Sequence, residues 1–435
     1  MLLEFSVRNF RCFRDEVTLD MTSPALSTLK PKDGLSWNDV TSRIAAVYGP
    51  NASGKSTLLR ALWSLARAVF GERDVLFEPH LFDGAHVEEP TEYRIEFVHD
   101  GVRYEYEVHA HVWGISYESL RRVVVGWNRV FLRQQAGPDA PISVVRGDAL
   151  KGATAQVKKI TTSRELFLAT ALRYEHFELA PIAQAFSMIR FIHHDDDEKD
   201  ARLQWVIQLL ASGGKYWKRL FSEVVKMADL GVNRIEIEER EVSKEGIERM
   251  RRLFSSVEGR ELDIPESLLM QMRRALVFFH QGADGKERRL YVGDQSAGTL
   301  TWLATAGPAV TTLGMGGVVV IDELDASLHP ALTGALVELF KDETLNVRGA
   351  QLIFSTHDIS LLDNSPIQLL ESKEVWLTSK SPTGASELYS IADFGSNRVG
   401  TNKFRRYVAG AYGAVPSVSV SGVHRLLSDL NRGVR

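Results

Sequence analysis

The stretch Gly49-Pro50-Asn51-Ala52-Ser53-Gly54-Lys55-Ser56 decides the fold of this chain. It fits the pattern G-x-x-x-x-G-K-[ST], in which glycines let the backbone curl so that its N–H groups point at phosphate oxygens. The apolar run Arg43–Tyr48 enters the stretch, and Ser56–Phe70 follows it with leucines at helical spacing. Because the order is strand, glycine loop and helix, the sequence predicts a phosphate-binding loop rather than a chance glycine turn.

Each residue type in this loop has an expected task in binding a nucleotide. Lys55 is expected to reach the β- and γ-phosphates of ATP, and Ser56 to offer its hydroxyl to Mg²⁺. The positive N-terminal end of the following helix adds a further attraction for phosphate. The other expected binding residues are Gly49, Pro50, Asn51, Ala52, Ser53, Gly54 and Thr57.

A second signal is the apolar strand Val318–Ile321, which ends in two carboxylates, Asp322 and Glu323. Ligands bind at the carboxyl ends of parallel strands, so acids at this place are candidates for chemistry. Asp322 is expected to hold Mg²⁺, directly or through water, and Glu323 to polarise the attacking water. The alternative is a solvated strand end, which the separate phosphate loop makes the weaker interpretation.

Further stretches complete a set of motifs in a fixed order. They are Gln295-Ser296-Ala297-Gly298-Thr299, of the form S-x-G; Leu324–Pro330 after the acidic pair; Ser355-Thr356-His357-Asp358; and the N-terminal pattern of Phe5, Asn9, Phe10, Arg11 and Phe13. With this set the sequence resembles the ABC-type ATPases of the soluble branch. That branch includes chromosome-maintenance (SMC and Rad50-like) heads, RecF-like repair proteins, OLD-like ATPases and, most similar of all, AAA-family ATPases of bacterial anti-phage defence systems.

The resemblance implies an α/β fold, namely an ABC-type phosphate-loop ATPase head with a β-rich lobe and an inserted helical domain. It implies that two chains pair head to tail as a homodimer, with each ATP held between Lys55 of one chain and Ser296 and Gly298 of the other. It also implies that His357 contacts the γ-phosphate region and senses whether hydrolysis has occurred.

The residues by themselves leave alternatives open at three places. Ser296 is also a suitable cap for the helix that begins near Thr299. His357 could be an ordinary histidine after a strand. The glutamine loop of the family is not assigned, because Gln134 and Gln135 follow a strand but could equally be surface residues.

Three segments are expected along the chain. Residues 1–190 form the N-terminal part of the head with the phosphate loop and β lobe, 195–275 the helical insertion, and 276–435 the C-terminal part with a partner-contact tail. Strands are predicted at Tyr93–Val98, Val102–Val112 and Val123–Val130, with turns at Asp100–Gly101 and Gly126. The insertion is predicted to hold helices at Arg202–Leu210, Tyr216–Asp229, Gly246–Ser255 and Pro265–Phe279, with a strand at Arg234–Val242. Leu290–Val292, Val318–Ile321 and Gln351–Phe354 are predicted as buried parallel strands alternating with helices.

Composition excludes several classes of protein. The chain has 435 residues and a net charge of −4, which argues against a protein that coats nucleic acid in general. One cysteine, Cys12, can form neither an internal disulfide nor a cysteine-based zinc site. Since no apolar run is long enough for a signal peptide or a membrane span, we expect a cytoplasmic protein without a membrane partner. The run His193–Asp197 could bind a metal, although such charged runs are usually solvated loops.

The favoured hypothesis is an ATP-binding and ATP-hydrolysing switch, the sensor and scaffold of an anti-phage defence system with a separate nuclease-like effector. It rests on the motif set and on a tail, Asp393–Gly395 and Lys403–Pro416, that resembles the ends of ATPases from such systems. A helix and a Gly-Pro turn packed on the core would explain the tail equally well.

The alternative hypothesis is a RecF-like DNA-binding repair or replication ATPase. It needs a basic groove, with Arg121, Arg122, Lys158, Lys159, Arg251, Arg252, Arg273 and Arg274 as candidate contributors. Paired basic residues are more often a solvated face. A third hypothesis is a nucleotide-gated module that does not hydrolyse ATP, and the presence of Glu323 argues against it.

Overall fold

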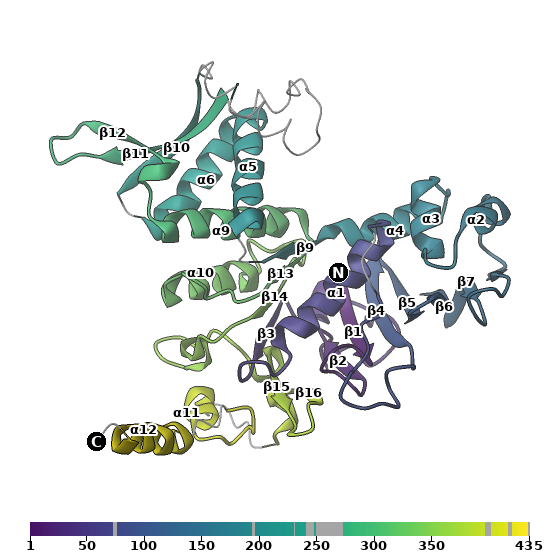
Figure 1. Ribbon diagram of the computed structural model, residues 1–435. Helices are drawn as coiled ribbons and strands as arrows, with labels where there is room; N and C mark the ends of the chain where they lie inside the picture. The colour runs from purple at the N-terminus through teal and green to yellow at the C-terminus, as the bar shows by residue number, and fades with distance from the viewer. Residues whose placement is uncertain are drawn as a thin grey trace. The chain divides into compact units, whose positions relative to one another are not determined.

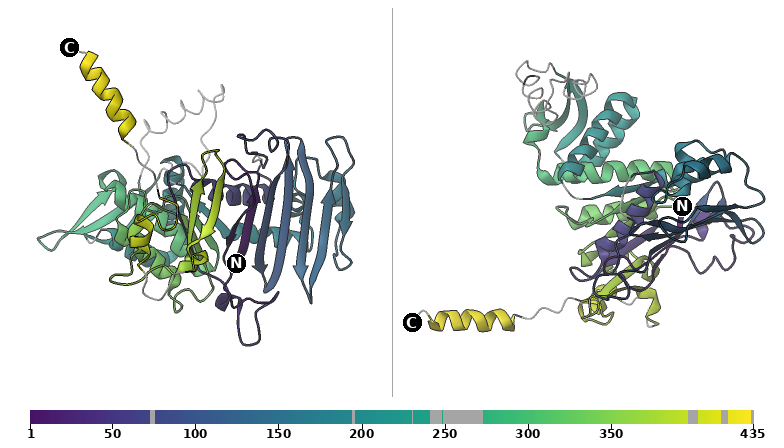
Figure 2. Two further views of the ribbon diagram at one scale, coloured as in Figure 1. Left: turned by 90° about the horizontal axis from the view of Figure 1, so that it is seen from below. Right: turned by 45° about the vertical axis from the view of Figure 1, so that its right-hand side comes forward.

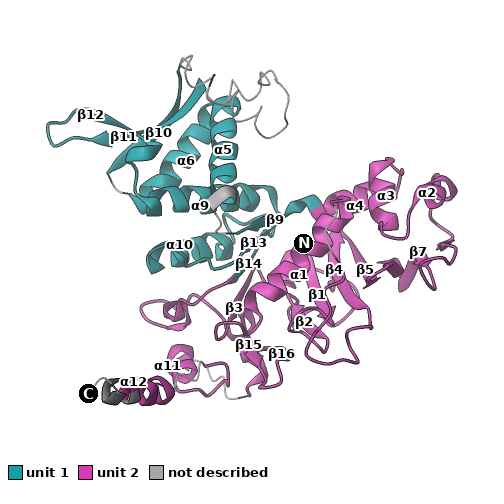
Figure 3. Ribbon diagram, in the orientation of Figure 1, with its two compact units in different colours: residues 1, 187–354 teal, residues 2–186, 355–435 magenta. Residues whose placement is uncertain are grey.

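The computed structural model describes residues 1–72, 76–193, 196–229, 231–240, 248, 273–395, 402–415 and 420–433. The chain divides into two compact units, which Figure 3 shows in different colours. Unit 1 comprises Met1 and Ser187–Phe354, and unit 2 comprises Leu2–Phe186 and Ser355–Arg435. The predicted C-terminal segment 276–435 is therefore shared: 276–354 lies in unit 1 and 355–435 in unit 2.

Unit 2 contains a seven-stranded antiparallel sheet in the order β2-β1-β4-β5-β6-β7-β8. Its strands lie side by side in the left view of Figure 2. They are β1 (Leu2–Arg8), β2 (Val17–Asp20), β4 (Thr91–His99), β5 (Val102–His111), β6 (Gly114–Val123), β7 (Trp127–Gln134) and β8 (Ser143–Arg146). This sheet confirms the expected β-rich lobe.

The turns predicted at Asp100–Gly101 and Gly126 are confirmed, whereas the strand predicted at Val123–Val130 is wrong in its bounds. The chain turns there, with the Val124 N–H donating to the Gly126 carbonyl at 3.1 Å, and two strands, β6 and β7, meet at the turn. Glu118 on β6 and Arg133 on β7 are fully buried and interrupt the apolar alternation that marks a strand. Burial raises the pKa of Glu118, although the nearby Arg133 guanidinium and two backbone N–H groups favour its charged form.

The phosphate loop of unit 2 follows a short buried strand. β3 (Ile44–Tyr48) pairs in parallel with β15 (Val375–Lys380), which pairs antiparallel with β16 (Ser386–Ser390). Every residue of β3 is buried, as its apolar sequence predicts. α1 (Lys55–Val69) begins directly after the loop and buries its leucine-rich face.

The other helices of unit 2 are short, apart from the last. They are α2 (Thr154–Ile160), α3 (Phe167–Arg173), α4 (Leu179–Gln184), α11 (Lys403–Val408) and α12 (Ser421–Gly433). The 3₁₀ turns are η1 (Trp37–Asp39), η2 (Ala185–Met188), η4 (Ile359–Leu362), η5 (Ser372–Glu374) and η6 (Ile391–Asp393). The last two residues of η2 belong to unit 1.

Unit 1 contains a parallel sheet in the order β14-β13-β9, formed by Gln351–Ser355, Val318–Ile321 and Ile189–Ile192. α10 (Pro330–Lys341) joins β13 to β14, which is the crossover expected between parallel strands. The predictions of buried parallel strands at Val318–Ile321 and Gln351–Phe354 are confirmed. Together with the β lobe, this sheet confirms the predicted α/β class.

A second layer of unit 1 packs on α9 (Ala297–Met315), and Figure 1 shows α5 (Asp196–Ser212) and α6 (Gly214–Ala228) beside it. The Trp302 indole N–H donates to the Val224 carbonyl at 2.5 Å, and the Arg202 Nε–H donates to the Ala304 carbonyl at 3.1 Å. Gly307 allows the close approach, because a Cβ there would lie 3.0 Å from the Phe221 ring. α5 and α6 confirm two of the predicted helices.

The rest of this layer is an antiparallel sheet of β10 (Val232–Glu239), β11 (Arg274–Gln281) and β12 (Glu287–Tyr291), with η3 (Val292–Asp294) leading into α9. The prediction of a helix through Phe279 is therefore wrong, because Leu276–Phe279 is strand. Periodicity cannot distinguish a short apolar run in a strand from one in a helix. Leu290 lies on a half-exposed antiparallel strand, so its predicted buried parallel strand is also wrong. Most of Gly246–Ser255, and residues 265–272, lie outside the described residues.

None of the helices in the described parts of the chain combines the length and apolarity needed to cross a bilayer.

Candidate nucleotide-binding site

The two glycines of the phosphate loop lie where a side chain cannot be placed. Gly49 has φ +150°, and a Cβ on it would overlap the Thr378 carbonyl oxygen and hydroxyl. Gly54 has φ +113°, and its Cβ would lie 3.0 Å from Cys12 Sγ and from the Phe13 ring. Both residues therefore need the conformational freedom and the small volume of glycine. This is the backbone that the sequence pattern predicts.

The side chain of Thr378 on β15 packs against the phosphate loop. Its hydroxyl is 2.6 Å from Ser53 Oγ and 3.2 Å from the Tyr48 carbonyl oxygen, and the side chain is fully buried. Ser53 Oγ also donates to the Pro50 carbonyl at 2.7 Å. Sequence reasoning missed Thr378, since a threonine in a strand far along the chain carries no signal of its contact with the loop.

The side chains expected to bind phosphate and Mg²⁺ are those of Lys55 and Ser56. Lys55 Nζ donates to the carbonyl oxygens of Gly49 at 2.9 Å and Pro50 at 3.2 Å, so the ammonium folds over the loop. Ser56, in the first turn of α1, is exposed. Asn51 and Ala52 form the exposed tip of the loop, and Thr57 is half-buried behind it. The loop therefore places a cation and a hydroxyl next to each other at the start of a helix.

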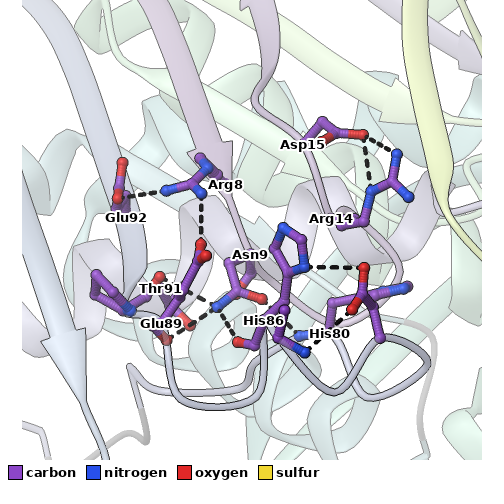
Figure 4. A network of polar contacts seen from close by, with 12 residues as sticks. Arg8, Asn9, Arg14, Asp15, His80, His86, Glu89, Thr91 and Glu92 are labelled. Atoms are coloured by element: carbon purple, nitrogen blue, oxygen red, sulfur yellow. Dashed lines mark hydrogen bonds and ion pairs between the residues drawn. The ribbon is translucent and has the colours of Figure 1, made fainter.

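Asn9 of the N-terminal pattern lies in a network of polar contacts, which Figure 4 shows. Asn9 is fully buried, and its Nδ2 donates to the carbonyls of His86 and Glu89 at 2.8 and 3.0 Å. Asn9 Oδ1 accepts from the His80 N–H at 2.8 Å, and the Asn9 carbonyl accepts from the Thr91 hydroxyl at 2.8 Å. Asn9 thus anchors the turn that places Cys12 and Phe13 against Gly54.

His357 is held beside the strand that leads into the loop. The Thr356 N–H donates to the Val47 carbonyl at 3.2 Å, and the Asp358 N–H donates to Thr356 Oγ1 at 2.9 Å. The Tyr48 hydroxyl donates to the Asp358 carbonyl at 3.1 Å. Unit 2 therefore brings together the phosphate loop and the segment that carries His357, far apart in the sequence.

The acidic pair lies in unit 1, at the carboxyl end of β13. The Asp322 N–H donates to the Ile192 carbonyl at 3.1 Å, which places Asp322 at the edge shared with β9. Glu323 is exposed and has φ +53°, an uncommon conformation for a residue with a Cβ. Strained backbone of this kind gathers at functional sites, and here it lies two residues after the end of β13.

Ser296 caps α9, as the simpler interpretation of the sequence predicts. Its Oγ accepts from the Thr299 N–H at 3.1 Å and lies 2.8 Å from Thr299 Oγ1. Ser296 is nevertheless exposed at the start of a long helix. A Cβ on Gly298 would lie 3.6 Å from the Ser327 carbonyl, so the stretch after the acidic pair borders this helix start within unit 1.

Two other candidates do not join these groups. Gln135 is buried in the β lobe, where its Nε2 donates to the Pro138 and Ala140 carbonyls at 3.2 and 3.1 Å, so its role is structural. Gln134 is exposed on β7, and the glutamine loop stays unassigned. In the run His193–Asp197, His194 and Asp195 lie outside the described residues. The described part of the chain contains no group of three or more His, Cys, Asp or Glu suited to a metal.

Strand, glycine loop and helix, with a lysine folded over the loop, define the class of phosphate-loop nucleotide-binding proteins. The chain belongs to the family described as "AAA domain, putative AbiEii toxin, Type IV TA system", whose profile matches residues 44–123 and 174–363. The match includes every motif residue from Gly49 to His357 and confirms the predicted resemblance to AAA-family ATPases.

Other comparisons add less. A comparison with curated proteins returned no match. Among solved structures, the SMC head domain from Thermotoga maritima is similar to this chain with a TM-score of 0.40 and 14% sequence identity. The similarity covers 89% of this chain and 98% of that domain.

Proposed function

We propose that this protein binds ATP with Mg²⁺, hydrolyses it, and works as a nucleotide-gated switch in a defence system. The observation that carries this proposal is the phosphate loop: two glycines at positive φ with neighbouring atoms against them, and Lys55 folded over the loop. Family membership supports the same conclusion, since the family description names both an AAA domain and a toxin–antitoxin system.

The residues present fit ATP and Mg²⁺. The loop N–H groups and Lys55 would hold the phosphates, and the exposed Ser56 hydroxyl with Asp322 would hold the ion. Mg²⁺ would neutralise charge on the phosphate oxygens. Glu323 would orient the attacking water and accept its proton, and His357 would contact the γ-phosphate region.

The proposed active form is a homodimer closed by two ATP molecules. Support comes from the exposed start of α9 at Ser296, whose N–H groups and helix dipole suit an anion brought by a second chain. A two-fold arrangement would give each ATP the loop of one chain and the α9 start of the other.

The switch is proposed to act on a separate effector protein. Support comes from α12 and the residue before it, where Val420, Val423, Leu426, Leu427 and Leu430 are each more than half exposed. Their spacing places these side chains along one face of the helix. A face of this kind marks a docking site for a partner. No observation favours the DNA-binding alternative: Arg121 is paired with Glu105, and Arg251 and Arg252 lie outside the described residues.

Purified protein carrying Lys55→Ala or Glu323→Gln tests the proposal. Lys55→Ala should lower ATP affinity by about a hundredfold, because a desolvated phosphate contact is lost. Glu323→Gln should keep ATP affinity and lower kcat by about a hundredfold or more, because the water loses its base. The measurements are binding of a fluorescent ATP analogue and release of phosphate.

Wild-type protein that neither binds nor hydrolyses Mg·ATP would contradict the proposal. Turnover by Glu323→Gln at the wild-type rate would remove the role of that carboxylate alone. Cleavage of nucleic acid by the chain on its own would contradict the division of work between this protein and an effector.

A further inference from the structure

The C-terminal segment 402–415 lies against the segment that carries His357. Asn402 Nδ2 donates to Asp363 Oδ1 at 2.9 Å and to Asn364 Oδ1 at 3.0 Å. Its Oδ1 accepts from the Arg405 N–H at 2.9 Å and so caps α11. One side chain therefore joins the start of α11 to the end of the η4 turn that follows His357.

A second contact connects the same segment to the phosphate loop. The Tyr407 ring, nearly buried, lies 6.1 Å from the ring of Tyr48, the residue directly before Gly49. The Tyr48 hydroxyl donates to the Asp358 carbonyl, directly after His357. Tyr48 thus touches both α11 and the His357 segment, so a displacement of α11 would be transmitted to the His357 segment.

Segment 402–415 is itself firmly held in unit 2. The Tyr407 hydroxyl donates to the Ala414 carbonyl at 3.1 Å, and the Tyr389 hydroxyl on β16 donates to the Tyr412 carbonyl at 2.7 Å. Tyr412 is fully buried, and its ring lies 5.2 Å from that of Phe394. Because both ends are anchored, the segment can act as a rigid support for what Asn402 and Tyr407 touch.

We propose that Asn402 and Tyr407 are positioning residues for ATP hydrolysis, which hold the His357 segment in place against β3. This inference rests on the proposed function, since His357 must face the γ-phosphate for its position to matter. The phosphate loop has its own support from Thr378 and the Asn9 turn. Loss of the Asn402 contact should therefore slow hydrolysis and leave nucleotide binding almost unchanged.

The decisive variants are Asn402→Ala and Asn402→Asp. Asn402→Asp keeps the oxygen that caps α11 but loses the donor, and it places a carboxylate against Asp363. Both should lower kcat about tenfold, with the Kd of a fluorescent ATP analogue within about twofold of wild type. Arg405→Ala is the matched control, because Arg405 is exposed and only its backbone N–H is used here; its kcat should not change.

A reciprocal exchange separates positioning from general stability. In Asn402→Asp with Asp363→Asn, the amide on residue 363 can donate to the new carboxylate, so kcat should recover to within about threefold of wild type. Tyr407→Phe keeps the ring against Tyr48 and gives a folded variant if Asn402→Ala is unstable; its kcat should fall less than that of Tyr407→Ala.

Two results overturn the inference. One is a lower melting temperature with unchanged kcat, which would make the segment purely structural. The other is failure of the exchange to restore kcat. A wild-type protein that binds no Mg·ATP would instead contradict the proposed function, so the two failures are distinguishable.

Discussion

At the scale of single residues, the shape of the phosphate loop depends on close packing around its two glycines as well as on its charged and polar groups. Lys55 and Ser56 supply charge and a hydroxyl, but the loop keeps its shape because Gly49 lies directly on Thr378 and Gly54 lies on Phe13. A side chain at Gly49 would overlap the Thr378 carbonyl, and one at Gly54 would press on Cys12 and on the buried Phe13 ring.

Gly49→Ala is therefore expected to lower the affinity for ATP, although it changes no catalytic group. Strain at positive φ and the overlap with Thr378 should lower the free energy of unfolding by about 2 kcal/mol, and ATP affinity should fall at least about tenfold. Denaturant unfolding and titration with a fluorescent ATP analogue check both. Gly137→Ala is the control, because a Cβ there meets open space; equal losses in the two variants would contradict the explanation.

At the scale of elements, α12 differs from the other helices of unit 2. α1 buries most of its apolar face, whereas α12 exposes Val423, Leu426, Leu427 and Leu430. Residues 421–435 contain three arginines and one aspartate, so this part of the chain is basic. The effector that we propose would therefore have an apolar groove with an acidic rim.

Leu426→Asp with Leu430→Asp should weaken effector binding at least about tenfold, because two apolar anchors become charged. The basal ATPase rate should stay within about twofold. The assay is co-purification and titration with the co-expressed product of the adjacent gene. Ser428→Asp adds charge on the opposite helix face and should have little effect. Unchanged binding by the double variant would exclude this face as the docking site.

At the scale of the whole molecule, the candidate residues are divided between the two units. The phosphate loop and His357 belong to unit 2, whereas Asp322, Glu323 and Ser296 belong to unit 1. Unit 1 also contains α5, α6 and the β10–β12 sheet, and Trp302 and Arg202 connect this layer to α9, which begins at Ser296. A ligand of that layer would therefore act on α9, the helix that we propose contacts the ATP of a second chain through Ser296.

Ser296 has a capping role and a proposed role in the dimer, and Ser296→Asp separates them. Aspartate keeps the cap on α9 but places a negative charge where the partner's ATP phosphate would approach. With ATP, Glu323→Gln protein should dimerise in light-scattering measurements, and the double variant with Ser296→Asp should stay monomeric while still binding ATP. Ser296→Asn, a neutral cap, is the control. ATP-dependent dimers of the Ser296→Asp protein would rule out the proposed interface.

The sequence by itself determined the phosphate loop, the acidic strand end and the helix start at Ser296, because each is a local pattern whose residue types follow directly from the chemistry. It also predicted the β lobe, α5, α6 and the parallel strands, whose apolar periodicity is clear. It failed at β6, where buried Glu118 breaks the alternation, and at β11, where a short apolar run suits either a helix or a strand.

Only the tertiary structure decided that Thr378 supports the loop and that Asn402 holds the His357 segment. These contacts join residues from separate parts of the chain, and a single threonine or asparagine gains such a role only through the neighbours that folding brings to it.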